Sequence, residues 1–206
     1  HNELGIGLGL YASKKIIEGH KGKIFVVSDT HFGHDREFIW QARGFTSVEE
    51  MNETIVFNWN SVVSPEDEVY LLGDVMLGGT ENIEYVKRLN GKLHIVLGNH
   101  DTSTRRKLYS ACENVVEVSL ASTLKYKKYN FFLTHYPCIT TNGTIESLKQ
   151  VVINLFGHTH QTSNFYENIP WIYHVGMDSH NCTPVNLDDA IVEMQEKFYS
   201  NHIIEP

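Results

Sequence analysis

The chain has few cysteines, few prolines and no long apolar run, and each scarcity excludes a class of protein. Its three cysteines are widely spaced and odd in number, so we expect no disulfide framework and a reducing compartment. No apolar run approaches the roughly 20 residues that a membrane span needs, and the N-terminal stretch lacks the layout of a signal peptide. The sequence therefore predicts a cytoplasmic protein that does not cross a membrane.

Clustered positive charge is also missing. The formal net charge is −8 with histidine neutral, and no block of lysine and arginine stands out. An extended nucleic-acid footprint needs such a block, so we expect none. A small phosphoester or nucleotide substrate still fits this charge, because metal cations at the site can supply positive charge locally.

Histidine, in contrast, is abundant, and it gathers where apolar runs end. The apolar run at residues 93–97 is followed by Gly98-Asn99-His100-Asp101. Four more runs end in the same way, in Asp29-Thr30-His31, in Gly73-Asp74, in His135 and in Gly157-His158-Thr159-His160. Short apolar runs closed by glycine and polar residues are typical of strands followed by loops. Open parallel sheets bind ligands at the carboxyl ends of their strands, so these five loops are expected to converge on one site.

The remaining patterns predict one α/β domain over residues 23–206. Strands at 23–28, 69–72 and 92–97 alternate with helices at 47–60 and from Thr80 to about 89, which favours a parallel sheet. The first of these helices begins with the capping box Ser47-x-x-Glu50. After a short helix, strand patterns at 115–120, 124–126 and 129–134 suggest a second, more antiparallel sheet. Strands at 151–156 and 171–175 and a helix at 187–199 complete the prediction.

Residues 1–22 stand apart as an N-terminal appendage whose role the sequence leaves open. Gly5, Gly7 and Gly9 open a segment that, over residues 1–24, resembles the glycine-rich lid and following helix of histidine-kinase ATPase domains. The other motifs of such an ATP site are not recognisable in the chain. A glycine-rich loop alone is weak evidence, so an unrelated appended segment or a helix packed on the domain is favoured over an ATP site.

The strand-end residues form a set of potential metal ligands. The mixture of imidazole, carboxylate and amide oxygen suits manganese, iron, zinc or nickel rather than a thiolate zinc site. Seven ligands are too many for one tetrahedral ion, but they suit two ions that share a carboxylate, about 3.5 to 4 Å apart. We therefore expect two divalent metal ions, manganese first, at Asp29, His31, Asp74, Asn99, His135, His158 and His160.

These motifs, complete and in order, resemble the signature of the calcineurin-like metallophosphoesterases. The Asp-Thr-His-Phe-Gly-His and His-Tyr-Pro forms look most like small bacterial and phage members of that family. The resemblance covers about residue 24 to the C-terminus. It implies an α/β fold, a four-layer α/β/β/α sandwich with two mixed sheets, and a site at the strand ends.

The resemblance also implies a role for each residue. Asp29, His31 and His160 would hold the first metal, Asn99, His135 and His158 the second, and Asp74 would bridge the two. A hydroxide bridging the metals would attack phosphorus, in line with the leaving group. His100 would protonate that group as general acid, and Asp101 would orient His100 and raise its pKa. The substrate contacts expected are His34, Asn99 and His100.

One departure from the wider family bears on the substrate. After Gly73-Asp74 the chain reads Val75-Met76-Leu77 and lacks the Asp-Arg-Gly of the Ser/Thr protein phosphatases. The missing arginine would grip a dianionic monoester, so phosphodiesters are slightly favoured. The alternatives are a metal-dependent nuclease, a non-catalytic binding scaffold of the same fold, and a nucleotide-binding module built on the N-terminal glycines. The sequence leaves the oligomeric state open.

Overall fold

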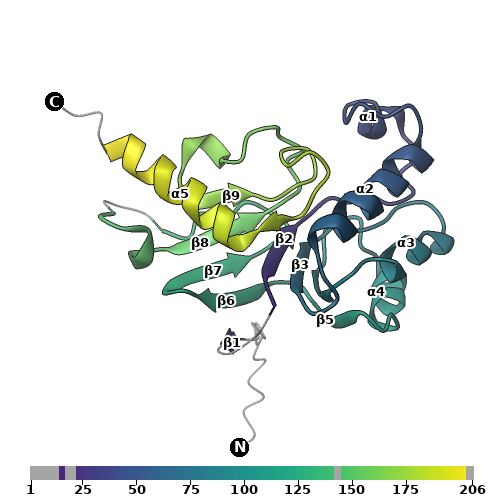
Figure 1. Ribbon diagram of the computed structural model, residues 1–206, viewed down its shortest axis with the longest axis horizontal. Helices are drawn as coiled ribbons and strands as arrows, with labels where there is room; N and C mark the ends of the chain where they lie inside the picture. Colours follow the sequence, from purple (N-terminus) through teal and green to yellow (C-terminus); the bar gives the residue numbers. More distant parts are fainter. Residues whose placement is uncertain (1–13, 17–21, 142–144, 203–206) are drawn as a thin grey trace, which may run out of the picture.

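A computed structural model describes residues 14–16, 22–141 and 145–202. Two five-stranded mixed sheets form its centre, with helices packed on them (Figure 1). This is the α/β fold of two mixed sheets that the sequence predicts. Cys112, Cys138 and Cys182 are free thiols. No helix in the described part of the chain has the length and apolar character needed to cross a membrane.

The first sheet carries three of the five strand-end loops. Its strands β2 to β5 are parallel, and β10 pairs antiparallel with β2. In spatial order they are β10 (Val185–Asn186), β2 (Ile24–Val27), β3 (Glu68–Leu72), β4 (Lys92–Val96) and β5 (Val115–Ser119). The helical segments between them are α1 (Glu37–Trp40), α2 (Val48–Val62), the 3-10 turn η1 (Thr80–Asn82), α3 (Ile83–Lys87) and α4 (Ser103–Ser110).

Local sequence signals explain several of these boundaries. Helix α2 begins where the capping box predicts, because the Ser47 side chain accepts a hydrogen bond from the backbone N–H of Glu50, at 3.1 Å. The helix expected from Thr80 is instead divided into η1 and α3. The strand expected at 115–120 was assigned to the wrong sheet: β5 lies parallel to β4, because α4 provides the crossover between them.

The second sheet is less antiparallel than we predicted. Its spatial order is β1 (Lys14–Ile16), β6 (Ser122–Tyr126), β7 (Tyr129–Leu133), β8 (Val152–Phe156) and β9 (Ile172–His174). Only the hairpin partners β6 and β7 are antiparallel, whereas the other neighbours pair in parallel. Long connections allow this, since a parallel pair needs a crossover of a dozen or more residues. The connections include the 3-10 turns η2 (Leu148–Gln150) and η3 (Tyr166–Asn168).

Little of the N-terminal appendage lies within the described residues. Lys14–Ile16 forms strand β1, paired parallel with β6, where the histidine-kinase resemblance would place a helix. Gly5, Gly7 and Gly9 lie outside the described residues.

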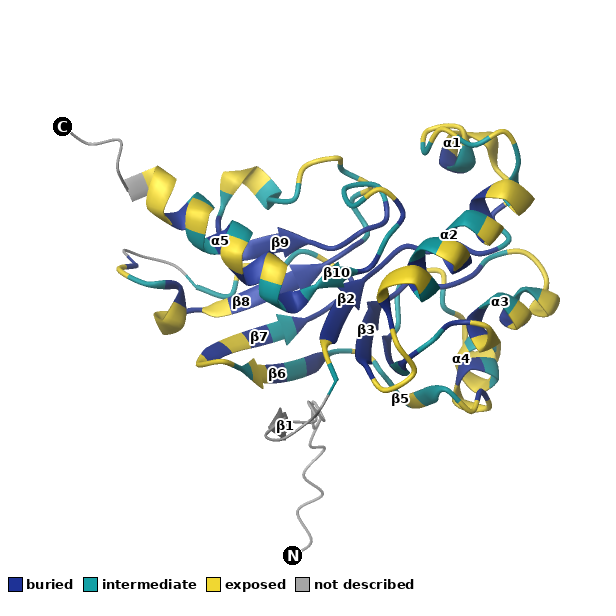
Figure 2. Ribbon diagram, viewed as in Figure 1, coloured by how far each residue is buried: buried dark blue, intermediate teal, exposed yellow. Residues whose placement is uncertain are grey.

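The central strands β2, β3 and β4 of the first sheet are buried on both faces, which fixes the positions of their carboxyl ends. Phe25 and Val27 face one hydrophobic cluster with Trp59 of α2, while Ile24 and Val26 face a second cluster shared with the other sheet and the C-terminal helix α5 (Leu187–His202). In Figure 2, β2 and β3 are buried throughout, and the outer faces of the helices are exposed. Strands buried on both faces read as continuous apolar runs, which is the pattern in the sequence.

Candidate metal centre

The five strand-end loops converge, and they bring their ligand-type side chains into two groups. Asp29, His31 and His160 form one group; Asp74, His135 and His158 form the other. Within each group the candidate ligand atoms lie within 4.8 Å of one another. The residues come from β2, β3, β7 and β8, so both sheets contribute. The sheets meet here, where Ser28 and Gly176 form an isolated parallel bridge beyond β2 and β9.

Asp74 lies between the two groups. Its Oδ2 is 3.4 Å from Nε2 of His135 and 3.9 Å from Nε2 of His31. Asn99 joins the second group, since its Oδ1 is 2.9 Å from Nε2 of His135. All seven predicted ligands are therefore gathered in one place, and the carboxylate expected to bridge lies at the centre.

The ligand atoms of the first group, Asp29, His31 and His160, also lie close to one another. His31 and His160 face one another with their Nε2 atoms 3.1 Å apart. Oδ1 of Asp29 lies 3.7 Å from Nε2 of His31 and 3.9 Å from Nε2 of His160. Two ring nitrogens and a carboxylate oxygen thus point at a common centre, which is the arrangement of a metal-binding triad.

Five of the seven ligand residues have left-handed backbone conformations. The φ angles are 57°, 51°, 52°, 70° and 49° for Asp29, His31, Asp74, His158 and His160. Each such residue costs of order 1–3 kcal/mol and persists only where the surroundings enforce it. Here the enforcement comes from backbone hydrogen bonds between loops, such as Asp29 N–H to Gly73 O and His31 N–H to Asp74 O, both at 3.0 Å. Strain of this kind concentrates at functional sites.

The glycines beside the ligands are required for the loops to pack this closely. A Cβ on Gly73, which has φ +91°, would lie 2.6 Å from Nδ1 of His135. A Cβ on Gly98 would lie 2.3 Å from Oδ1 of Asp74. The repeated glycine-plus-ligand pattern of the sequence therefore has a steric cause.

Hydrogen bonds set the orientation of two histidine rings. Nδ1 of His135 bonds to the carbonyl oxygen of Leu72 at 2.8 Å, and Nδ1 of His160 bonds to Oδ2 of Asp178 at 2.9 Å. Each bond places the proton on Nδ1 and leaves the lone pair of Nε2 free toward the centre. Metal-binding histidines in proteins are fixed in this way.

Asp178 and Arg43 contact the candidate metal ligands, although neither is among the predicted site residues. Arg43 donates to both oxygens of Asp178, at 3.0 and 3.1 Å, and to the carbonyl oxygen of Asp29 at 2.8 Å. Hydrogen bonds from Arg43 and His160 hold the pKa of Asp178 far below its usual range, although burial opposes this. Asp178 follows strand β9 and Gly176, so the strand-end signal could have found it. Arg43 follows α1 and carries no such signal.

Burial and missing partners show that this donor set fits metal cations. Oδ1 of Asp29, which faces the first group, is buried and has no hydrogen-bond partner among the described residues. Burial raises the pKa of Asp29 and lowers that of His31 to about 2. Burial opposes ionisation of Asp74 too, but the hydrogen bond and charge of His135, the backbone N–H of His100 and the charge of His31 together outweigh it and lower the pKa of Asp74 to about 2. Unpartnered buried polar atoms are costly, and a divalent cation would satisfy the carboxylates and the unprotonated Nε2 atoms together.

The predicted substrate contacts line a cavity at the metal centre. The cavity has a volume of about 530 Å³, and His34, Asn99 and His100 are among its walls. The His34 ring lies 5.3 Å from that of His31, and the His100 ring lies 5.8 Å from it. The side chain of His100 is 44% exposed, and its Nε2 lies 3.9 Å from Oδ2 of Asp74.

The carboxylate of Asp101 contacts other groups than the His100 ring, which it was expected to orient. Its carboxylate accepts hydrogen bonds from the backbone N–H groups of Asp74 and Gly98, both at 2.8 Å, and from the Tyr109 hydroxyl at 2.7 Å. These bonds tie the loop after β3 to the loop after β4. Asp101 thus holds the backbone around Asp74, and among the described residues its hydrogen bonds do not include the His100 ring.

Comparison with known proteins identifies the family. The family model of the calcineurin-like phosphoesterase superfamily domain matches residues 23–197, which is most of the chain. The chain belongs to this superfamily. The matched region contains all seven ligand residues and both sheets except β1, and phosphoester hydrolysis is the chemistry that the superfamily supports in general.

Several known proteins resemble this chain over most of their length. The uncharacterized protein MJ1445 of Methanocaldococcus jannaschii is 32% identical over 184 residues, which are 85% of this chain and 92% of that protein. The Gene 66 protein of Mycobacterium phage L5 is 28% identical over 177 residues, or 74% and 84% of the two chains. A protein of unknown function from Aquifex aeolicus, AQ665, shares the fold, with a TM-score of 0.61 at 22% identity, over 83% of this chain and 98% of its own.

Proposed function

We propose that this protein is a phosphoesterase that uses two divalent metal ions and acts on phosphodiesters in preference to phosphomonoesters. One observation carries the proposal: two ligand groups adjoin across a single carboxylate, Asp74, at the converging strand ends. A single metal ion would leave one of the two groups without a purpose.

The residues divide between the two ions as their positions suggest. Asp29, His31 and His160 would hold one ion, and Asn99, His135 and His158 the other, with Asp74 shared. Manganese is the first metal to test, because mixed nitrogen and oxygen ligands suit it, as they do iron, zinc and nickel. When bound, two such ions lower the pKa of a water molecule between them and neutralise phosphate oxygens.

His100 is the general acid in this proposal. Its ring is exposed to the cavity and lies beside Asp74, so it can reach the oxygen that leaves phosphorus. His34 and Asn99 line the same cavity and would contact the substrate. Asp101 acts through the backbone that it holds, as a positioning residue.

The lining of the cavity supports diesters. Among the described residues that form its walls there is no lysine or arginine. A phosphomonoester brings two negative charges to the site and a diester only one, so a site without an extra cation favours the diester. The substrate class we propose is a small phosphoester or a nucleotide.

Hydrolysis of bis-p-nitrophenyl phosphate tests the proposal. Chelator-treated protein should be inactive, and activity should return as two equivalents of Mn²⁺ bind. Asp74→Asn should remove activity and weaken binding of both ions, because it replaces the shared carboxylate. Full activity after chelation would exclude the two-metal mechanism. No metal binding at all would exclude it too and favour a non-catalytic binding scaffold.

The role of His100 needs substrates with different leaving groups. General acid catalysis contributes roughly 10²- to 10⁴-fold, and it matters most for a strongly basic leaving group. His100→Ala should therefore slow cleavage of a dinucleoside phosphate, which releases an alkoxide, far more than cleavage of bis-p-nitrophenyl phosphate. An equal loss on both substrates would show that His100 binds substrate but does not donate the proton.

A further inference from the structure

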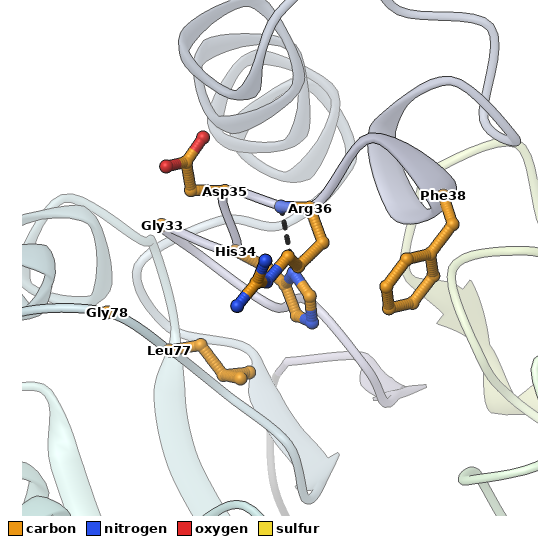
Figure 3. Close-up of a pocket in the computed structure, with 7 residues that line it drawn as sticks. All are labelled: Gly33, His34, Asp35, Arg36, Phe38, Leu77 and Gly78. Carbon is orange, nitrogen blue, oxygen red and sulfur yellow. Dashed lines mark hydrogen bonds between the residues drawn. The ribbon is translucent and has the colours of Figure 1, made fainter.

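A second groove opens beside the metal cavity and is not used by the site described above. It has a volume of about 540 Å³. One wall is the loop from Gly33 to Phe38 after β2, and the other is Leu77-Gly78 after β3 (Figure 3). His34 and Phe38 line both this groove and the metal cavity, so the two spaces adjoin. A substrate bound at the metals can extend into the groove.

Arg36 is the cationic residue in the lining of the groove, which also includes Asp35. The arginine is exposed, and its guanidinium has no carboxylate partner among the described residues. In Figure 3 the Arg36 side chain extends on the same side of the loop as the His34 ring, whereas that of Asp35 points the other way. The backbone N–H of Arg36 donates to Nδ1 of His34 at 3.3 Å, which connects the arginine to the metal cavity. An unpaired guanidinium there can bind a phosphate group, through two parallel hydrogen bonds.

Phe38 provides a flat apolar surface at the junction of the two spaces. Its side chain is 68% exposed. Its ring packs T-shaped against the His34 ring, with centroids 5.5 Å apart, and the exposed part of the ring can accept another ring. Nucleic-acid bases stack on exposed aromatic side chains of this kind.

A side chain connects the wall of the groove to the backbone of the proposed general acid. The guanidinium of Arg105 donates to the carbonyl oxygen of His100 and, at 3.4 Å, to that of Gly78. The backbone of the general acid is thereby joined to the groove wall. Because the groove adjoins the metal cavity, a leaving group that takes a proton from His100 can extend into it.

We propose that this groove is a subsite for the leaving group and that it selects a nucleotide. The base stacks on Phe38, and a second phosphate of the same nucleotide pairs with Arg36. The inference rests on the proposed function and gives it a substrate class: phosphodiesters whose leaving group is a phosphorylated nucleoside.

The same chain offers a matched control for both residues. A depression elsewhere on the surface is lined by Phe57, which is 74% exposed, and by Arg88. Its arginine is already neutralised, because both terminal nitrogens of Arg88 bond to Glu53, at 2.8 and 2.6 Å. This depression shares no lining residue with the metal cavity. This depression therefore has an exposed phenylalanine and an arginine, but its arginine is paired with a carboxylate and it does not adjoin the metal cavity.

Calorimetry on the Mn²⁺-loaded protein tests the subsite by comparing the dissociation constants of four ligands of increasing size. The ligands are inorganic phosphate, ribose 5-phosphate, adenosine 5′-phosphate and adenosine 3′,5′-bisphosphate, each of which adds one group to the last. We expect the base to improve the dissociation constant about tenfold and the second phosphate to improve it about tenfold again. Phe38→Ala should remove the first gain, and Arg36→Gln the second. Phe57→Ala and Arg88→Gln should preserve both.

The outcomes separate this inference from the proposed function. If adenosine 5′-phosphate binds no better than ribose 5-phosphate, or if the Phe38 and Arg36 variants retain both gains, the nucleotide subsite is wrong. Hydrolysis of bis-p-nitrophenyl phosphate in the same preparation then shows whether the two-metal phosphoesterase stands. If that hydrolysis is absent while the base and the second phosphate each still tighten binding, the groove binds nucleotides and the catalytic proposal fails.

Discussion

At the scale of single residues, the candidate metal ligands depend on side chains that do not touch the metals. His160 points its Nε2 at the first group because Asp178 holds its Nδ1, and Arg43 holds Asp178 in turn. The side chain of Arg43 is almost fully buried, and that of Asp178 is 12% exposed. The ion pair therefore lies in a largely dry setting where its geometry is fixed.

Asp178→Asn should weaken the metal group that contains His160. The amide cannot stabilise the Nδ1–H tautomer as a carboxylate does, and loss of such a partner typically costs about 10- to 100-fold in metal affinity. Competition with a chelator would measure the affinities of the two ions separately. We expect only one to fall, and Glu196→Gln, an exposed change on α5, should leave both unchanged. Equal affinities in wild type and Asp178→Asn would show that Asp178 does not position His160.

At the scale of elements, the site is made of loops that interlock rather than of loops that merely lie near one another. The loop after β3 contacts the loop after β4 through Gly73 and Gly98, whose backbones are too close for a side chain at either position. The carboxylate of Asp101 joins the same two loops. A substitution in the loop after β3 is therefore expected to displace the loop after β4 as well.

Gly73→Ala tests this interlocking, with Gly44→Ala as its control. Both glycines have positive φ, +91° and +84°, so alanine costs similar backbone strain at each. At Gly44 an added Cβ meets nothing within 4 Å, whereas at Gly73 it meets His135 and Gly98. Overpacking of this kind costs roughly 1–3 kcal/mol. Denaturant unfolding should show Gly73→Ala to be less stable than Gly44→Ala by about that amount. Equal losses would mean that strain alone requires these glycines.

The same scale shows why part of the topology could not be predicted. Strand positions followed from apolar runs, because a strand buried on both faces has a distinctive sequence. The partner of a strand is set by its crossover, which leaves little trace in the strand itself. β5 is a five-residue strand like β6 and β7, but helix α4 delivers it to the edge of the first sheet.

At the scale of the whole molecule, the sequence predicted the ligands far better than their surroundings. All seven candidates carry a local signal, a metal-ligand side chain at the end of an apolar run, and the fold gathers them. Arg43 and Arg36 have no such signal, because their importance comes from which distant atoms they approach. Asp101 was found, but its role was not, since only the structure shows that its oxygens face backbone N–H groups.

Buried neutral histidines should make the stability of the whole molecule depend on pH. Burial lowers the pKa of His174 from 6.5 to about 3. Between these values the unfolded chain binds a proton that the folded chain excludes, so this contribution is complete above about pH 6.5 and is lost as the pH falls toward about 3. One group of this kind changes the free energy of unfolding by up to ~1.4 kcal/mol per pH unit. Urea titrations of chelator-treated protein should show the decline, and His174→Gln, which keeps a polar group near the Ser179 hydroxyl, should make it shallower. The same slope in both proteins would assign the decline to the other histidines whose pKa burial lowers, such as His31 and His180.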